Sequence, residues 1–326
     1  MRYRQLGRSG LTVSVVALGC NAFGLNLDEG QSGALVHAAL EAGVTLFDTA
    51  PNYGSEPGAS ERFLGAALRG HRDEVVVSTK VAGYSTRVAS NAPASRRALR
   101  PSIDASLKRL GTDFIDLVYV HQPDTETPVE ETLEALGELI AAGKVRYVAS
   151  SNLKAWQIVE AELLARDPAR ARFIGAQNAY SLIDRQAELE VAPVCERYGI
   201  GLAPYFPLAH GLLAGGYRRG EAPAEGSRLA RRSWVTDDES VLDAVDAVKD
   251  FAGKRGLSVL EVALGGLAAK PAVATVVAGA SKPEQVRANA AASDWVPSAD
   301  DALELEQIAQ PRRYVPLGSR TGHRRA

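Results

Sequence analysis

The sequence is poor in cysteine and carries almost no net charge. Its two cysteines, Cys20 and Cys195, lie far apart and form no CxxC pair, which argues against a metal site and against a disulfide framework. The formal net charge of −2 over 326 residues gives no electrostatic reason to expect nucleic acid or an acidic membrane surface as a partner. We therefore expect no metal ion, no nucleic-acid partner and a reducing compartment.

Long hydrophobic runs are also missing. No stretch approaches the roughly 20 consecutive apolar residues that span a bilayer, and Met1–Gln5 lacks the apolar core of a signal peptide. These features predict a cytoplasmic protein without a membrane partner. What the sequence does have is 46% hydrophobic and 23% charged residues, the composition of a globular protein with a large core.

One pattern repeats along most of the chain: a short β-rich run, a loop, an amphipathic helix, a glycine and then the next run. Eight such runs occur, near Val15–Leu18, Thr45–Phe47, Val75–Ser78, Ile115–Val120, Arg146–Ala149, Phe173–Ala176, Gly201–Ala203 and Ala274–Val277. The glycines that separate helix from run, where a left-handed C-cap is favoured, are Gly43, Gly70, Gly111, Gly143 and Gly199. The runs are almost continuously apolar, as expected for parallel strands that are buried on both faces.

Eight alternating units over this length predict an α/β protein, a (β/α)8 TIM barrel formed as one domain by residues 1–326. A doubly wound sheet is the alternative, but it would normally carry a GxGxxG turn after the first strand. The chain instead reads Leu18-Gly19-Cys20-Asn21-Ala22-Phe23-Gly24 there. Residues 1–18 comprise the first strand and, before it, a predicted β-hairpin whose turn contains Gly10, which we expect to close the bottom of the barrel.

Two segments of the chain are irregular. Residues 206–237 form the longest loop, which contains Arg218, Arg219, Arg228, Arg231 and Arg232. A loop of this length inside a compact domain commonly covers a binding site, although a solvated basic surface loop is an equally good interpretation. Residues 312–326 are basic and are predicted to be a flexible tail.

Polar side chains occur at the ends of three neighbouring runs. Asp48 follows the second run, Lys80 ends the third and His121 ends the fourth, while Tyr53 lies in the loop beyond Asp48. The C-terminal strand ends of a (β/α)8 barrel face one common cavity. Each residue alone has an ordinary structural explanation, as a turn cap, a lysine that reaches solvent or a core histidine. Four of them at the same end of a barrel favour a catalytic site.

Longer motifs surround these four residues and continue through the chain. They are Asp48-Thr49-Ala50-Pro51-Asn52-Tyr53-Gly54, Ser78-Thr79-Lys80, Leu117-Val118-Tyr119-Val120-His121-Gln122-Pro123-Asp124, Ala149-Ser150-Ser151-Asn152, Gln177-Asn178-Ala179-Tyr180-Ser181-Leu182, Pro204-Tyr205-Phe206-Pro207-Leu208 and Gly279-Ala280-Ser281-Lys282-Pro283-Glu284-Gln285-Val286. In this order they resemble the aldo-keto reductase family over nearly the whole chain. The resemblance implies an oxidoreductase that reduces a small aldehyde or ketone with NAD(P)H.

The resemblance also implies a role for each of the four polar residues. Tyr53 would donate a proton to the carbonyl oxygen, and because a free phenol with a pKa of about 10 is a weak acid, the ammonium of Lys80 would lower that pKa. Asp48 would pair with Lys80 and keep it charged. His121 would hydrogen-bond the carbonyl oxygen and orient it.

For the cofactor, the resemblance implies an extended dinucleotide across the barrel mouth. Ser151, Asn152 and Gln177 would bind the nicotinamide carboxamide, and Tyr205 would stack on the ring. The remaining contacts would come from Gly19, Cys20, Asn21, Asp48, Phe206, Pro207, Leu208, Gly279, Ser281, Lys282, Gln285 and Asn289. Lys282 at the start of the last helix suits a 2′-phosphate, so NADPH is favoured over NADH. Gln285 stands where family members often have an arginine, which weakens this preference, and Ala278 replaces a common proline.

Candidate substrate contacts are Phe23, Tyr84, Gln122 and Trp234, all in loops that follow strands. They would accept an aryl or alkyl aldehyde or the keto group of a sugar. Two other functions stay open: a Schiff-base aldolase in which Lys80 attacks a carbonyl, and a nucleotide-binding regulatory subunit on the same fold with little turnover. The sequence does not indicate the oligomeric state.

Overall fold

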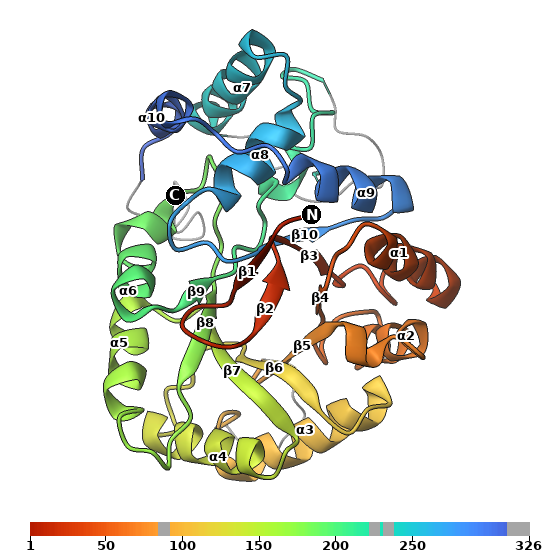
Figure 1. The fold of residues 1–326 in the computed structure, drawn as a ribbon, viewed down its shortest axis with the longest axis vertical. Coiled ribbons are helices and arrows are strands. Elements are labelled where there is room, and N and C mark those ends of the chain that lie inside the picture. The colour runs from red at the N-terminus through yellow and green to blue at the C-terminus, as the bar shows by residue number, and fades with distance from the viewer. Residues whose placement is uncertain (84–91, 222–228, 231–237, 312–326) are drawn as a thin grey trace, which may run out of the picture.

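The structure, a computed structural model, describes residues 1–83, 92–221, 229–230 and 238–311. Its main sheet consists of eight parallel strands: β3 (Val16–Gly19), β4 (Leu46–Asp48), β5 (Val76–Val81), β6 (Ile115–Val120), β7 (Val145–Ser151), β8 (Phe173–Gln177), β9 (Gly201–Leu202) and β10 (Val276–Gly279). Neighbours follow the order β10-β3-β4-β5-β6-β7-β8-β9. Single bridges join Leu202 to Val273 and Tyr205 to Val277, so β9 meets β10 and the sheet curls into a barrel (Figure 1). The predicted tail, residues 312–326, lies outside the described residues.

Ten α-helices occur in the described residues: α1 (Glu29–Glu41), α2 (Ala59–Ala67), α3 (Arg96–Leu110), α4 (Val129–Ala141), α5 (Ala155–Leu164), α6 (Val191–Tyr198), α7 (Glu239–Lys254), α8 (Val259–Ala268), α9 (Pro283–Ala292) and α10 (Ala299–Ile308). Short 3-10 helices include η1 (Arg72–Glu74), η2 (Gln186–Leu189) and η3 (Ala209–Gly211). Most of the α-helices surround the strands, whereas α7 and α10 pack together outside that ring (Figure 1). Within the described part of the chain, no helix is both long and apolar enough to cross a membrane.

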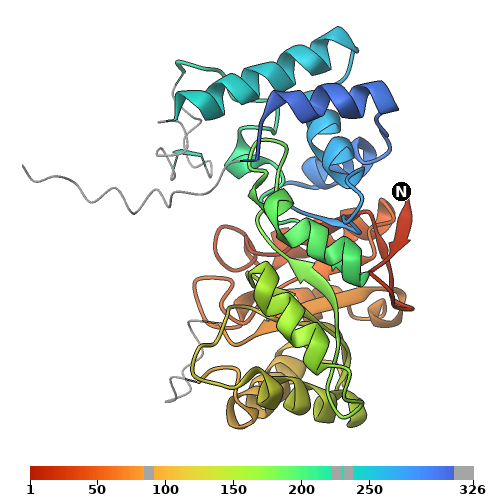
Figure 2. The ribbon, with the colours of Figure 1, turned by 90° about the vertical axis from the view of Figure 1, so that its left-hand side faces the viewer.

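A β-hairpin closes the bottom of the barrel, as predicted. Its strands are β1 (Tyr3–Gln5) and β2 (Thr12–Ser14). Leu6, Leu11 and Val13 are buried in one cluster with side chains from inside the barrel. The turn approaches the barrel so closely that a Cβ on Gly7, at φ +61°, would lie 2.4 Å from the carbonyl oxygen of Ile174. Figure 2 shows the hairpin at one end of the barrel, opposite the loops that follow the strands.

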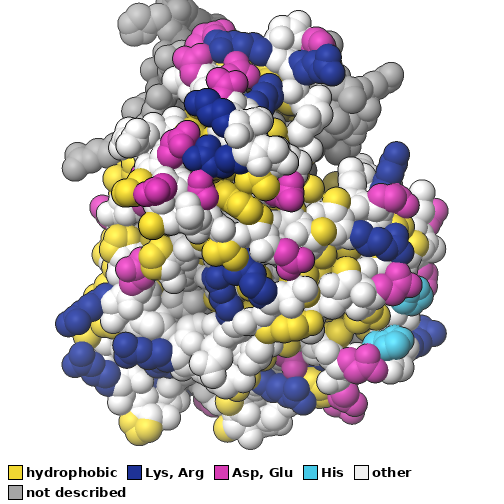
Figure 3. Space-filling view, turned by 45° about the horizontal axis from the view of Figure 1, so that its top comes forward, with side chains coloured by type: hydrophobic (Ala, Val, Ile, Leu, Met, Phe, Trp, Pro, Cys, Tyr) yellow, Lys and Arg dark blue, Asp and Glu magenta, His cyan; other side chains and the backbone are white. Residues whose placement is uncertain are grey.

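The predicted strand–helix pattern agrees with the structure, with shifts of one to three residues at the strand ends. All eight predicted runs contain strands, and the five predicted C-cap glycines have positive φ. The closed sheet rules out the doubly wound alternative. One shift matters for the site, because β5 continues to Val81 and Lys80 therefore lies within the strand, with its side chain buried. On the face seen in Figure 3, basic and acidic side chains are interspersed, in keeping with the small net charge.

We expect Leu6→Ala to destabilise the barrel, because Leu6 is completely buried between the hairpin and the barrel interior. Deletion of a buried leucine side chain typically costs about 2–5 kcal/mol of unfolding free energy. Urea unfolding followed by circular dichroism measures it. Leu303→Ala is the matched control, since Leu303 is 65% exposed. Equal midpoints for the two variants would show that the hairpin does not contribute to the core.

Candidate active site

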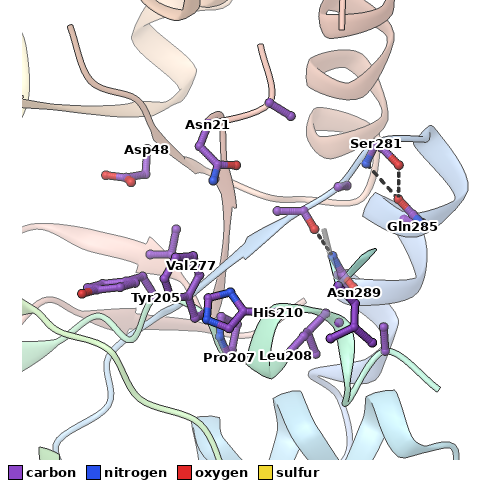
Figure 4. A pocket seen from close by; sticks show the side chains of 18 of the residues that line it. Asn21, Asp48, Tyr205, Pro207, Leu208, His210, Val277, Ser281, Gln285 and Asn289 are labelled. Carbon is purple, nitrogen blue, oxygen red and sulfur yellow. Dashed lines mark hydrogen bonds between the residues drawn. The ribbon is translucent and has the colours of Figure 1, made fainter. Parts of the chain in front are cut away.

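A cavity of about 1120 Å³ opens at the C-terminal end of the barrel strands. Its lining comes from the ends of β3, β4, β6, β7, β8 and β10, from the loop after β9 and from α9 (Figure 4). Ligand pockets typically measure about 300–1000 Å³, so this volume suits a large ligand such as a dinucleotide. The strand ends therefore converge on one site, as the (β/α)8 fold predicts.

A buried ion pair lies at the base of this cavity. The Lys80 ammonium donates to Asp48 Oδ2 over 2.7 Å and to the carbonyl oxygen of Thr49 over 3.0 Å. The other carboxylate oxygen of Asp48 accepts from Ser78 and Gln177, so both oxygens are hydrogen-bonded. Burial would lower the pKa of Lys80, but the neighbouring Asp48 carboxylate and Tyr53 outweigh it, and the pKa is raised. Lys80 therefore remains a cation.

Tyr53 lies above this pair, on the loop between β4 and α2. Its backbone N–H donates to Ala50, which forms a tight turn, and its ring centroid is 4.9 Å from the Lys80 ammonium. Burial raises the pKa of the phenol, and the positive charge of Lys80 opposes this without reversing it. The net direction is opposite to the lowering that the resemblance implied. The Tyr53 hydroxyl is therefore fully protonated at neutral pH.

His121 completes the group from the end of β6. Its backbone N–H donates to Val81, and its ring meets Tyr53 edge to face, with the centroids 6.3 Å apart. Burial and then the charge of Lys80 lower the pKa of His121 to about 4, so the imidazole is neutral at physiological pH. The structure thus brings together the four residues that the sequence placed at the ends of three neighbouring strands or in the loop beyond one of them. They are Asp48, Tyr53, Lys80 and His121, called the tetrad below.

Next to this group, a hydrogen-bonded cluster of amide and hydroxyl side chains lines the cavity. The amide of Asn152 donates to the carbonyl oxygen of His121 and to Ser151, and its oxygen accepts from Tyr205 over 2.7 Å. Ser151 donates to the backbone of Gln177. This cluster fixes the Tyr205 ring in the cavity lining, an arrangement that can orient a flat aromatic ligand such as nicotinamide.

The far end of the cavity is formed by β10 and the start of α9. Ser281 donates from its backbone and its hydroxyl to Gln285, and Asn289 donates to Gly279 (Figure 4). The N-terminus of the ten-residue helix α9 lies at this end, and the positive end of a helix dipole favours an anion. With an aromatic platform near the tetrad and an anion-binding helix start at this end, the residues fit an extended nicotinamide dinucleotide.

Some predicted contacts lie elsewhere. Cys20 and Phe23 are completely buried beside the cavity, and Lys282 is exposed at the N-cap of α9 without lining it. Tyr84 and Trp234 lie outside the described residues. The other predicted contacts line the cavity, and Lys80 lies beneath it.

Sequence reasoning missed His210, Arg218 and Val277, which do line the cavity. Of these three, only Arg218 could have been selected from the sequence, because it belongs to the arginine cluster in the long loop.

Comparison with known proteins agrees with this geometry. The family model described as "Aldo/keto reductase family" matches residues 15–310. The chain belongs to the aldo/keto reductase family. A "Probable voltage-gated potassium channel subunit beta" of Oryza sativa subsp. japonica is 36% identical, covering 96% of this chain and 98% of that protein. The resemblance derived from the motifs is therefore confirmed.

Other relatives of this aldo/keto reductase are described as reductases. The "L-glyceraldehyde 3-phosphate reductase" of Escherichia coli (strain K12) is 33% identical, over 98% of this chain and 93% of that protein. The "Versiconal hemiacetal acetate reductase" of Aspergillus parasiticus is 32% identical, over 99% of this chain and all of that protein (100%). The reductases among these relatives have different substrates in their names, so family membership leaves the substrate open.

We expect Asp48→Ala to destabilise this aldo/keto reductase by about 3–5 kcal/mol, because it leaves the buried Lys80 ammonium without its carboxylate partner. Thermal or urea unfolding measures the change. Asp104→Ala is the matched control, since the ion pair of Asp104 with Lys144 is largely solvent-exposed and is expected to contribute less than about 1 kcal/mol. A similar loss in both variants would contradict the buried-pair interpretation.

Proposed function

We propose that this aldo/keto reductase reduces an aldehyde or ketone to an alcohol with hydride from NADPH and that Tyr53 is the proton donor. The observation that carries the proposal is the stacked arrangement of Asp48, Lys80 and Tyr53, with the buried ion pair directly beneath a protonated phenol. A neutral His121 beside the phenol supports it. Because a buried ion pair is weak evidence for a gain in stability, a structural role alone does not account for this set.

In the proposed reaction, a bound reduced nicotinamide supplies the hydride. The Tyr53 hydroxyl gives its proton to the carbonyl oxygen as negative charge develops there. The phenolate left on Tyr53 lies over the Lys80 ammonium, whose charge stabilises it at a ring distance of 4.9 Å. A neutral His121 can donate one N–H to the same carbonyl oxygen and so orient it. Asp48 acts through Lys80, by holding the ammonium in place.

The preference for NADPH is assigned to Arg218, in the loop after β9. The residues on either side of it are anchored on α7: Tyr217 is buried beneath Lys249, and Arg219 binds Glu239, Asp243 and Asp246.

This anchoring leaves Arg218 on the cavity side, where it lines the wall near Glu221. An arginine there can pair with a 2′-phosphate, a role for which Lys282 is less well placed because it does not line the cavity.

The relatives described as potassium channel subunits favour a second candidate, a regulatory subunit that binds the cofactor with little turnover. We rank it below the reductase because the complete tetrad is assembled in this chain. The third possibility, an aldolase, is disfavoured. Lys80 is buried and its ammonium is bound to Asp48 and to the backbone of Thr49, so it cannot reach a carbonyl as a free amine.

We expect Tyr53→Phe to lower kcat by about 10²- to 10⁴-fold, since the variant removes the proposed proton donor and keeps the ring. NADPH consumption with a panel of aldehydes, ketones and quinones measures it. The Kd for NADPH should be unchanged. Tyr3→Phe is the matched control, because Tyr3 is half-exposed on the hairpin.

Unaltered kcat in Tyr53→Phe would remove Tyr53 from the mechanism. A wild-type protein that binds NADPH but reduces none of the panel would favour the regulatory candidate.

We expect Arg218→Ala to raise the KM for NADPH by about five- to tenfold and to leave the KM for NADH within about twofold, because only NADPH has the 2′-phosphate. Lys282→Ala is the control and should change neither value. Steady-state kinetics with both cofactors measure the effect. If the KM for NADPH rose in Lys282→Ala and not in Arg218→Ala, the 2′-phosphate contact would instead lie at the start of α9.

A further inference from the structure

Tyr119 lies on β6 beside Lys80 and takes no part in the proposed chemistry. The two residues are register partners on adjacent parallel strands, so their side chains point to the same side of the sheet. That side is the barrel interior, where Tyr119 is completely buried in one cluster with Leu117 and Ala149. The tyrosine therefore lies where the apolar interior meets the buried ion pair.

The ring of Tyr119, and not its hydroxyl, is the part that contacts Lys80. The ring centroid is 5.7 Å from the Lys80 ammonium, within the roughly 6 Å at which an aromatic face attracts a cation. Within the described part of the chain, no hydrogen bond of standard length and angle holds the hydroxyl. Burial, and then the charge of Asp48, raises the pKa of Tyr119, so the phenol is neutral. The contact is therefore one between a cation and an uncharged ring.

The polar contacts that hold the Lys80 ammonium come from one side of β5. Its acceptors, Asp48 and the carbonyl oxygen of Thr49, belong to β4 and the loop after it, and so does Tyr53. Tyr119 approaches from β6, which lies on the other side of β5. A lysine side chain has a flexible four-carbon stem, so its position depends on the contacts around the ammonium. The Tyr119 ring supplies the contact from the side of β6.

We infer that Tyr119 is a positioning residue whose ring face holds the Lys80 ammonium beneath Tyr53. The inference rests on the proposed function, in which Lys80 stabilises the phenolate that forms on Tyr53. An aromatic face attracts a cation but carries no net charge, so it can fix the ammonium without neutralising it. A second carboxylate in this place would also fix Lys80, but its negative charge would oppose formation of the phenolate. A neutral ring therefore suits a site in which the cation has to keep its effect on Tyr53.

The first test separates the ring from the hydroxyl in the full chain. Tyr119→Phe keeps the ring, and we expect its kcat with NADPH and the panel of carbonyl compounds to stay within about twofold of the wild type. Tyr119→Leu removes the ring, and we expect kcat to fall about tenfold because the ammonium is less well fixed. The Kd for NADPH should stay within about twofold in both variants, since Tyr119 lies beneath the cavity and not in its described lining.

A leucine also changes the packing, so a second test varies the charge distribution of the ring at nearly constant shape. Phenylalanines with one, two and three ring fluorines are introduced at position 119, because each fluorine draws negative charge away from the ring face. We expect kcat to fall about twofold per fluorine and the urea midpoint of unfolding to fall in the same order. A ring that only fills space would show no such order.

Phe173 is the matched control for both tests. It is 4% exposed and lies at the start of β8, the strand end away from the cavity. Phe173→Leu should leave kcat unchanged, and the fluorine series at position 173 should change neither kcat nor the order of the urea midpoints.

Equal kcat values and equal midpoints across the series at position 119, in a protein whose wild type is active, would overturn the inference and leave the proposed function intact. A loss of kcat in Tyr119→Phe as large as that in Tyr119→Leu would also overturn it, because the hydroxyl would then be the part that matters. A wild-type protein that reduces none of the panel would overturn the proposed function. The urea midpoints would then still decide whether the ring holds Lys80: a stepwise fall supports the contact, and a flat series contradicts it.

Discussion

The ion pair between Lys80 and Asp48 is the interaction on which the site depends. Two opposite charges are held almost out of contact with water, and such burial is tolerated only where each charge has its partners. Here they come from β4, β5 and β8, through Asp48, Ser78 and Gln177, so the pair also ties three strands together at the mouth. The same contacts that stabilise the buried charges also hold the Lys80 ammonium beneath the Tyr53 phenol. Structural support and proposed chemistry therefore rest on one set of contacts.

The bottom of the barrel contributes mainly to stability, whereas the mouth carries the candidate site. The bottom is closed by the hairpin and filled by the apolar side chains of Leu6, Leu11 and Val13. At the mouth, five of the described residues other than glycine have a left-handed backbone, each at a cost on the order of 1–3 kcal/mol: Ala82, Asn152, Phe206, Ala209 and His210. All five follow the C-terminal ends of strands. A well-packed lower half offsets this strain, which lets the loops place Asn152 and His210 where they contact the cavity.

The sequence was sufficient to predict the fold and the proximity of Asp48, Tyr53, Lys80 and His121, because both depend on local signals. Alternating runs and glycines mark the barrel units, and Asp48, Lys80 and His121 come at or next to strand ends, whose positions the barrel dictates. The sequence was insufficient where burial determines a pKa or where loop geometry determines the position of a side chain. The net pKa of Tyr53 depends on the balance of desolvation against the charge of Lys80, and no motif encodes that balance. Whether Arg218 and Lys282 line the cavity depends on how the loop after β9 and the start of α9 pack, which no motif encodes.

The two ends of the cavity are held by contacts of different kinds, and this bears on how the protein responds to its surroundings. Asp48 and Lys80 are buried strand residues, where salt screens charges little. The loop after β9 is held by Arg219 and its three carboxylates on α7, all of them partly or largely exposed, and Arg218 is exposed as well. Exposed pairs are weak and are screened by salt. Higher ionic strength should therefore weaken the contacts of the loop after β9 and of Arg218, while the arrangement of Lys80 and Asp48 stays the same.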